Sequence, residues 1–245
     1  MNQSISHRQA IIEDVTGGLP TGAALLDFGC GDGKEVMEWR SRGYQALGCD
    51  VAQYSDSDEC RTLYSQGVLR LIRTEPYRLP FDDHTFDVVV SNQVFEHVRN
   101  YPVAIKETQR VLKPGGVALH LFPPRWKPVE AHVNVPFAGV WQNTAWLHLW
   151  ALLGVRNEFQ SGMSASQVAR LNVDYLREHT NYLAATELRR EFERHFSTVR
   201  FVEDVYLRHS PSRKARALYW IQTVIPAVRA AYSCFFERVV VAVKS

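Results

Sequence analysis

The chain has 245 residues, of which 46% are hydrophobic and 22% are charged, and these proportions exclude the disordered, collagen-like and coiled-coil classes. Lysine and arginine total 28 against 26 acidic residues, and a net charge of +2 gives no support to a general nucleic-acid-binding protein. The length suits a single domain over residues 1–245. Four of the six tryptophans lie within one stretch of 25 residues: Trp126, Trp141, Trp146 and Trp150.

The cysteines and the amino terminus both point to a cytoplasmic protein. The four cysteines lack metal-ligand spacing, so we expect reduced thiols and no metal. The opening sequence MNQSISHRQAIIEDV lacks the apolar centre of a signal peptide. The longest stretch without Asp, Glu, Lys or Arg runs from Ala131 to Val155, and its proline, asparagine and histidine residues are unsuited to a membrane-spanning helix.

The first half of the chain alternates short apolar runs with amphipathic stretches, which predicts strands that alternate with helices. Such alternation indicates an α/β fold with a doubly wound, mainly parallel sheet. Proline and glycine between Lys113 and Gly116 are expected to stop the helix before them. The expected strands are 24–28, 45–50, 68–73, 86–91 and 117–122, and the expected helices are 35–41 and 103–112.

The rhythm breaks at residues 123–183, which are aromatic and irregular and contain four prolines between positions 123 and 136. It resumes with a charged helix at 186–196 and a strand at 198–205. Residues 208–236 form an additional segment, basic at first and then apolar with a helical period, in which Pro226 should produce a kink. A last strand is expected at 239–243, which brings the sheet to seven strands.

The sequence LLDFGCGDG at 25–33 places Gly29, Gly31 and Gly33 directly after the first strand. Glycine lets a backbone approach a ligand closely and adopt positive φ. The spacing is GxGxG, whereas nicotinamide dinucleotide sites use GxGxxG, and position 34 is a lysine, which disfavours a dehydrogenase. Asp50 ends the next strand, where an acid can accept hydrogen bonds from both hydroxyls of a ribose.

Three further motifs accompany the glycine loop: GCDVA at 48–52, LPFDDHTFDVVVSNQVFEHV at 79–98 and LKPGGVALHLFPP at 112–124. Together the four motifs resemble the class I S-adenosylmethionine-dependent methyltransferases, in the subgroup called type 11. The resemblance covers residues 20–125 and, more loosely, 184–205. It implies a Rossmann-like methyltransferase fold, S-adenosyl-L-methionine as the cofactor, and a helical lid inserted at 123–183.

The resemblance also implies roles for individual residues. Asp27 would orient the glycine loop and the amino group of the cofactor, and Gly29 and Gly31 would face its methionine part. Asp50 would hold the ribose, and Val51 would pack on the adenine.

Other positions match the family less closely. Glu75 would accept a hydrogen bond from the adenine amino group. Pro76 has no backbone N–H, so either a neighbouring residue donates to the adenine ring or the loop has a different register. Asn92 would line the methyl-transfer pocket, and His97 matches a frequent histidine of the subgroup that is either structural or catalytic.

A hydroxyl acceptor benefits from a general base that removes its proton. The candidates are His132, His97, His120 and Glu130, and we favour His132 because it follows the fifth strand at the edge where open α/β sheets bind ligands. The alternative for His132 is a loop histidine that fixes backbone geometry. His120 lies within a strand and is expected in the core.

Several acceptors and partners stay open at this point. The first hypothesis is methylation of a hydroxyl on a small molecule or glycan, lipid-linked or from the cell envelope. The second is methylation of a lipophilic ring such as a quinone or polyketide, and the third is an inactive cofactor-binding scaffold. The tetrapeptide SNQV after the fourth strand disfavours nucleic-acid methylation. The tryptophan-rich lid and the basic segment suit peripheral contact with the inner face of a membrane, or packing within the core or a homodimer.

Overall fold

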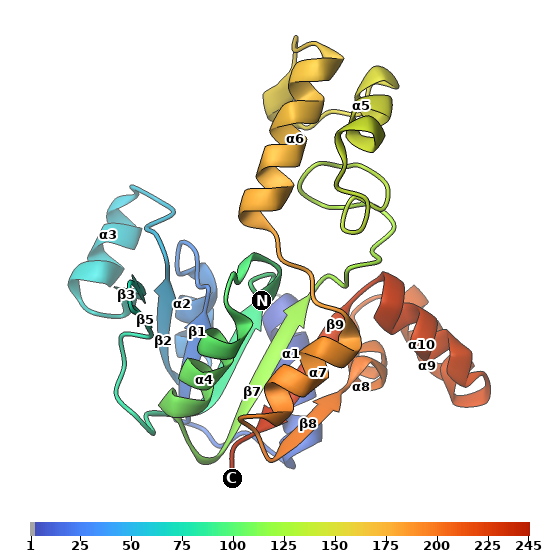
Figure 1. Cartoon of the computed structure of the whole chain (residues 1–245). Coiled ribbons are helices and arrows are strands. Elements are labelled where there is room, and N and C mark those ends of the chain that lie inside the picture. Colours follow the sequence, from blue (N-terminus) through green and yellow to red (C-terminus); the bar gives the residue numbers. More distant parts are fainter. Residues whose placement is uncertain (1–2) are drawn as a thin grey trace.

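The computed structural model describes residues 3–245, so the first two residues of the predicted domain lie outside the described part. Its centre is a seven-stranded sheet in the order β3-β2-β1-β6-β7-β9-β8 (Figure 1). The first five of these strands are parallel and β9 is antiparallel to both of its neighbours, which confirms the predicted α/β fold. The strands are β1 (Ala24–Phe28), β2 (Gln45–Asp50), β3 (Leu69–Leu71), β6 (Phe86–Asn92), β7 (Leu112–Phe122), β8 (Thr198–Phe201) and β9 (Arg238–Val243).

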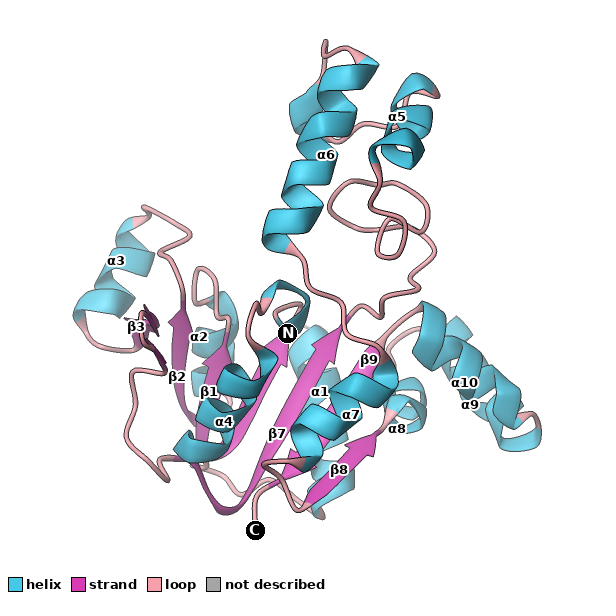
Figure 2. Ribbon diagram, in the orientation of Figure 1, coloured by secondary structure: helices cyan, strands magenta, loops and turns pink. Residues whose placement is uncertain are grey.

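Helices cover both faces of the sheet (Figure 2). Successive side chains of a strand point to opposite faces, and β6 shows this directly. Val88 and Val90 pack in one apolar cluster with Trp39, whereas Val89 packs in another with Ile105. The first face carries α1 (Gln3–Thr16), α2 (Lys34–Ser41), α3 (Asp58–Ser65) and α8 (Glu203–His209), and the second carries α4 (Tyr101–Val111) and α7 (Ala185–Glu193).

The predicted lid stands above the carboxyl ends of the parallel strands (Figure 1). It contains α5 (Thr144–Leu152), the short helix η2 (Glu158–Gln160) and α6 (Ala165–His179). The lid has an apolar core of its own, which includes Val135, Leu147 and Leu176, so it is a packed unit and not a loose loop. The lid therefore stands above the edge of the sheet where ligands of open α/β folds bind.

The basic and apolar segment near the carboxyl terminus forms two helices, α9 (Arg213–Val224) and α10 (Pro226–Phe235). The expected kink at Pro226 is a complete break. Proline cannot continue α9, because it lacks the N–H that the helix needs, but it is well suited to the first position of α10.

Two strand predictions were wrong in extent. The strand expected at 198–205 ends at Phe201, and the chain then forms α8. Glu203 and Asp204 in the first turn of α8 and Arg208 in its last turn complement the helix dipole, which favours a helix over further pairing. The strand expected at 68–73 is only Leu69–Leu71, because the chain leaves the sheet for a small hairpin of β4 (Arg73–Thr74) and β5 (Tyr77–Arg78).

Besides α8, two helices on the first face were not predicted. The helix α1 has a weakly periodic sequence, although its Ile5, Ile11 and Ile12 are fully buried. The side chain of Ser57 caps α3 by accepting from the N–H of Cys60, a signal that the sequence contains. In addition, β7 begins at Leu112, five residues before the expected strand, so the proline and glycines after α4 already belong to the sheet.

Candidate functional site

The glycine loop joins β1 to α2 at the carboxyl edge of the sheet. Gly29, Gly31 and Gly33 have φ of 82°, 55° and 83°, a region that side chains disfavour. The N–H of Gly29 donates to the carbonyl of Cys49 over 2.8 Å, which fixes the loop to the end of β2. These contacts fix the shape of the loop.

The three glycines differ in what lies next to them. A Cβ atom on Gly29 would lie 2.2 Å from Cγ2 of Val94, and one on Gly33 would lie 2.7 Å from Cδ1 of Leu69. A Cβ atom on Gly31 would meet no atom within 4 Å. Gly29 and Gly33 are therefore required for packing, whereas Gly31 faces open space that a ligand can occupy.

Asp50 lies beside this open space at the end of β2. One carboxylate oxygen accepts from the N–H of Gly31 over 2.9 Å and the other from the N–H of Val51 over 2.7 Å. Burial raises the pKa of Asp50, and these two hydrogen bonds partly offset the effect. Each oxygen retains a lone pair. Val51 and Tyr54 next to it are 53% and 65% exposed, so the carboxylate and the apolar surface together fit the ribose and base of a nucleoside.

Asp27 lies near the end of β1, just before the glycine loop, and its side chain is buried. Burial raises its pKa to about 7, although the nearby guanidinium of Arg8 opposes the rise. Arg8 comes from α1 and forms an ion pair of 2.6 Å with Glu35 of α2, in which the arginine is buried and the glutamate is partly exposed. The first helix therefore closes this side of the site, and Arg8 belongs to no motif that could have identified it beforehand.

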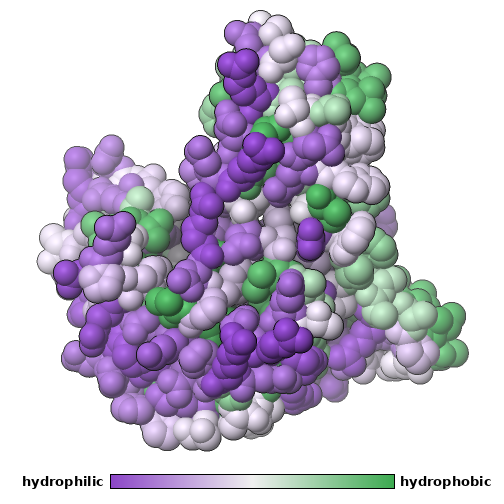
Figure 3. Space-filling view, in the orientation of Figure 1, coloured by the Kyte–Doolittle hydropathy of each residue, from purple (hydrophilic) through white to green (hydrophobic). Residues whose placement is uncertain are grey.

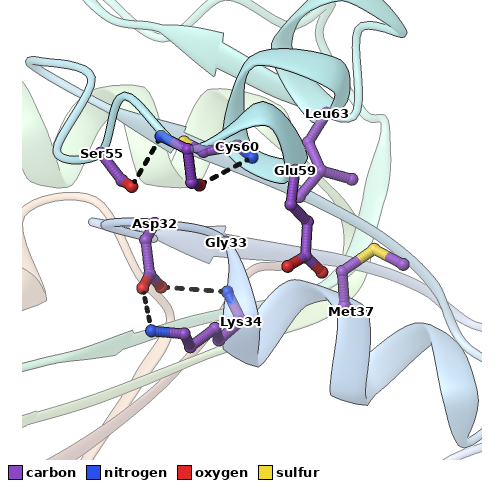
Figure 4. A pocket seen from close by; sticks show the side chains of 9 residues that line it. Asp32, Gly33, Lys34, Met37, Ser55, Glu59, Cys60 and Leu63 are labelled. Atoms are coloured by element: carbon purple, nitrogen blue, oxygen red, sulfur yellow. Dashed lines mark hydrogen bonds and ion pairs between the residues drawn. The ribbon is translucent and has the colours of Figure 1, made fainter.

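A small hollow of about 190 Å³ lies on the outer flank of the glycine loop (Figure 4). Asp32 holds this part of the loop through an ion pair of 2.5 Å with Lys34 and a hydrogen bond of 3.2 Å from the same residue's N–H. Ser55, Glu59 and Cys60 face the loop from the other side. The hollow therefore separates the segment that follows β1 from the segment that follows β2 at this edge of the sheet.

Two other predicted positions lie apart from the loop. Glu75 is exposed in the turn of the hairpin formed by β4 and β5, and its carbonyl accepts from Nε of Arg73 over 3.2 Å. Asn92 is half-buried at the end of β6. Gln93 directly after it has a φ of 56°, an uncommon value for a residue with a side chain, and such conformations gather at functional sites.

The favoured histidine lies in a buried polar cluster. Nδ1 of His132 is 2.5 Å from Oε1 of Glu130, whose side chain is 2% exposed. The other oxygen of Glu130 accepts from the N–H groups of His132 and Val133 over 2.8 and 2.9 Å. The hydroxyl of Tyr182 donates to Oε1 over 2.9 Å. The carboxylate thus holds the imidazole in one orientation, with Nε2 available to another group.

Electrostatics distinguish the members of this cluster. The hydrogen bond to Glu130 raises the pKa of His132 above 6.5, although burial opposes the rise. Burial alone would raise the pKa of Glu130, but its hydrogen bonds, above all the one with His132, bring that pKa below its ordinary value. Sequence reasoning offered these two residues as alternative bases, and the structure joins them as one pair.

His97 packs edge to face against the ring of His132. It lies in the short helix η1 (Phe95–His97) after β6, and its ring centre is 4.8 Å from that of His132. Nδ1 of His97 is 2.6 Å from the carbonyl of His179, so this nitrogen donates and Nε2 is left as an acceptor. Burial lowers the pKa of His97. Tyr175 of α6 lies 5.5 Å from His132, ring centre to ring centre.

Two other titratable groups near this edge have distinct surroundings. His120 is fully buried, as expected of a core residue, and burial lowers its pKa to about 3. The carboxyl group of Glu96 is buried, and neither oxygen has a hydrogen-bond partner among residues 3–245. Burial raises the pKa of Glu96 to about 7, partly opposed by the charge of His132. Glu96, Tyr175 and Tyr182 were not identified from the sequence.

Within the described residues, no cluster of three or more histidine, cysteine, aspartate or glutamate side chains is arranged to hold a metal ion. Over the same residues, no helix has the length and apolar character needed to cross a membrane.

Comparison with known proteins matches part of this chain to methyltransferases. Residues 26–120 match the family model described as methyltransferase domain. The chain is 31% identical over 99 residues to malonyl-[acyl-carrier protein] O-methyltransferase of Erwinia pyrifoliae, covering 39% of this chain and 35% of that protein. It is 30% identical over 122 residues to demethylmenaquinone methyltransferase of Staphylococcus aureus, covering 46% of this chain and 48% of that protein.

Sterol 4-C-methyltransferase strm-1 of Caenorhabditis elegans is 30% identical over 94 residues, covering 37% of this chain and 28% of that protein. The chain thus spans less than half the length of each of these curated relatives.

Solved structures agree in fold over nearly the whole chain. The YcgJ protein of Bacillus subtilis has a TM-score of 0.53 at 15% identity, covering 97% of this chain and 98% of that chain. A geranyl diphosphate methyltransferase in complex with sinefungin has a TM-score of 0.51 at 18% identity, covering 99% and 78%. The [4+2]-cyclase SpnF has a TM-score of 0.52 at 18% identity, covering 99% and 81%. At these identities the likeness establishes the fold alone.

Proposed function

We propose that this chain is a class I, S-adenosyl-L-methionine-dependent methyltransferase and that it methylates a hydroxyl of a small molecule or glycan. Its residues 26–120 match the methyltransferase domain. The observation that supports a hydroxyl acceptor is the pair of Glu130 and His132 beside His97, at the carboxyl edge of the sheet. A hydroxyl must lose its proton as the new bond to oxygen forms, and an imidazole held by a carboxylate is suited to accept that proton.

In this proposal the glycine loop and Asp50 hold the cofactor. The open space at Gly31 admits its methionine part, Asp50 binds the ribose hydroxyls, and Val51 covers one face of the adenine. Asp27 orients the loop from below, while Gly29 shapes it. Glu75, whose side chain is exposed in the hairpin, accepts a hydrogen bond from the adenine amino group.

When bound, the cofactor supplies a methyl group on a positively charged sulfur, which is reactive toward nucleophiles without further activation. The chain's own residues align the acceptor and remove its proton. Nε2 of His132 takes the hydroxyl proton, Glu130 stabilises the resulting imidazolium, and Tyr182 keeps Glu130 in place. Asn92 and His97 line the same pocket and orient the acceptor.

The surface of the lid favours an acceptor that is a sugar or is linked to a lipid. Trp141, Trp146 and Leu149 line an open hollow of about 440 Å³ on its surface, together with the polar side chain of Asn143. Tryptophan rings stack on sugars and also suit the boundary between lipid and water. We therefore place the acceptor in the cell envelope or on a lipid carrier. Such an acceptor is consistent with peripheral contact at the inner face of a membrane, or with a homodimer.

A second candidate function is methylation of carbon on a lipophilic ring. The relatives named demethylmenaquinone methyltransferase and sterol 4-C-methyltransferase favour it, each at 30% identity over part of the chain. The atom that receives the methyl group separates the two candidates, and carbon-13 spectra of the labelled product report it: an oxygen-bound methyl supports the first candidate and a carbon-bound methyl the second. If no acceptor becomes labelled, the result would favour the third hypothesis, an inactive cofactor-binding scaffold.

Calorimetry with S-adenosylhomocysteine tests the cofactor site. The double variant Asp50→Ala with Gly31→Arg should abolish binding, because it removes the ribose acceptor and fills the open space. The matched control is Asp174→Ala with Gly162→Arg, since Gly162 also has positive φ with open space around it and Asp174 is exposed on the lid. Equal binding by the first double variant and the wild type would refute the site.

A further inference from the structure

The hairpin of α9 and α10 leaves an unusually apolar surface uncovered. Trp220 is 70% exposed, Val224 is 81% exposed, and Ile225 at the turn between the helices is 51% exposed. Gln222 is the one buried residue in the two helices. A helix in a globular protein normally buries an apolar stripe against its neighbours. This stripe faces outward, and large exposed apolar patches mark surfaces that bind something.

The charge of the same segment is one-sided. Between residues 205 and 236 there are five lysine and arginine residues and no aspartate or glutamate. Two of the five, Arg208 and Arg229, form ion pairs with Asp14 and Asp204 outside the segment. Arg213 and Lys214 each precede an exposed apolar residue, Trp220 and Ile221, by seven positions, which is two helical turns on the same side of α9. Arg213 and Lys214 form no ion pair with any residue in the described range 3–245. Cations and apolar side chains therefore share one exposed face.

A second apolar patch lies on the lid. Leu152 and Leu153 at the end of α5 are 65% and 66% exposed, and Phe159 after it is 79% exposed. No charged residue of either sign other than histidine occurs between Ala131 and Val155. In the space-filling view, the apolar surfaces of α5 and of the α9–α10 hairpin appear on the same flank of the molecule (Figure 3).

We infer that the α9–α10 hairpin, together with the exposed end of α5, docks on an anionic lipid bilayer. A bilayer takes up apolar side chains at the level of the headgroups, and its anionic lipids attract the neighbouring cations. A second copy of the chain fits this surface poorly, because a twofold contact would bring two acid-free, positively charged segments together. The inference concerns where the protein lies, and it holds whichever acceptor atom is methylated.

Vesicle flotation of the full chain tests the inference. The probe is a vesicle of phosphatidylcholine with about one third phosphatidylglycerol, compared with phosphatidylcholine alone. We expect the protein to bind the anionic vesicle. This binding should fall at least about fivefold between about 0.01 M and 1 M salt, because the electrostatic screening length shortens from about 30 Å to 3 Å. Equal binding to both vesicles, or no binding to either, would overturn the inference.

Variants assign the binding surface. Trp220→Ser with Val224→Ser, and separately Arg213→Glu with Lys214→Glu, should each reduce vesicle binding at least about tenfold, because both apolar insertion and charge attraction are required. The matched control is Lys106→Glu with Arg190→Glu, exposed cations on α4 and α7 outside the hairpin, which should bind as the wild type does. Circular dichroism confirms that each variant folds. Equal loss in the control would show that only net charge matters and would contradict the assigned surface.

Two additional measurements separate the bilayer from other occupants. Quenching of tryptophan fluorescence by brominated lipid should be weaker in Trp220→Phe than in the wild type, and equal quenching would contradict insertion of this residue. Sedimentation without vesicles should show the same molecular mass for the wild type and for Trp220→Ser with Val224→Ser. A dimer that this variant dissociates would identify a second copy as the occupant and overturn the inference.

Discussion

Nδ1 of His132 lies 2.5 Å from Oε1 of Glu130, and the same carboxylate is held by the hydroxyl of Tyr182. The two partners of the central pair are only two residues apart, but the tyrosine is 52 residues from the glutamate and lies after α6, near the end of the lid. This arrangement connects the loop after β7 with the chain that returns from α6. It explains why the proposed base has a fixed orientation, and it leads to several predictions.

Glu130→Gln should lower the rate and shift its dependence on pH. The wild-type pKa of His132 is raised above 6.5 by Glu130, so its neutral, proton-accepting form predominates only above that raised value. The rate should therefore rise with pH through a midpoint above 6.5. In the variant the midpoint should move to lower pH, because the carboxylate charge is gone. Measuring the rate against pH with labelled cofactor checks this prediction. The same midpoint in the variant and the wild type would show that His132 is not the base.

Tyr182→Phe should reduce turnover by about ten- to hundredfold and leave cofactor affinity unchanged. The substitution removes one hydrogen bond to a buried carboxylate, and such bonds contribute about 1.5–3 kcal/mol. Tyr175→Phe is the matched control, because Tyr175 contacts His132 through its ring and not through a hydroxyl bond to Glu130. If both variants lose activity equally, the hydrogen bond to Glu130 is not the cause.

Two glycine substitutions in the same loop should have different effects. Gly29→Ala should destabilise the fold by about 1–3 kcal/mol, because the new methyl group would overlap the side chain of Val94. Gly31→Ala meets no neighbour and should cost only the strain of positive φ, about 1–2 kcal/mol, yet weaken cofactor binding. Thermal unfolding and calorimetry measured on both variants separate the two roles. Normal cofactor affinity in Gly31→Ala would argue against ligand in that space.

His120 should make the fold less stable in acid. Its pKa is about 3 in the folded chain, against an ordinary value of 6.5, because burial disfavours the charged ring. The unfolded chain therefore takes up the proton first, so the stability that neutral His120 contributes is present above 6.5 and is lost as the pH falls toward 3.

Replacement of His120 by a side chain that does not titrate tests this effect. In His120→Gln, the decline of the unfolding free energy on the acid side should be shallower by up to about 1.4 kcal/mol per pH unit. Urea titrations at several pH values between 6.5 and 4 provide the measurement. An identical slope in the two proteins would show that His120 is not the group responsible.

Much of the core was predictable from the sequence because its signals are local. The valines of β6 and the apolar run of β1 require burial on both faces, and a glycine loop between strand and helix has few other structural explanations. The helix α8 was missed because Val205 and Leu207 continue an alternating pattern, while the helix is favoured by charges at its ends.

The site was predictable only in part. The cofactor positions follow from contiguous motifs, so each could be proposed by number. The partnership of Glu130 with His132 depends on a turn in which Asn134 adopts a φ of 58°, and the contact with Tyr182 depends on how the lid folds back. Neither has a periodic signal. In α9 the apolar stripe was visible in the sequence, but whether a neighbour covers Trp220 and Val224 could be known only from the structure.

The central proposal is that the chain transfers a methyl group to a hydroxyl whose proton His132 removes. The most direct test measures label transfer from S-adenosyl-L-methionine to a pool of envelope glycans and small hydroxyl compounds, by the wild type and by His132→Ala, with the cofactor affinity of both determined in parallel. The proposal predicts that the substitution lowers turnover by about 10²–10⁴-fold while the cofactor affinity stays within about twofold. An unchanged rate of transfer by His132→Ala would contradict it.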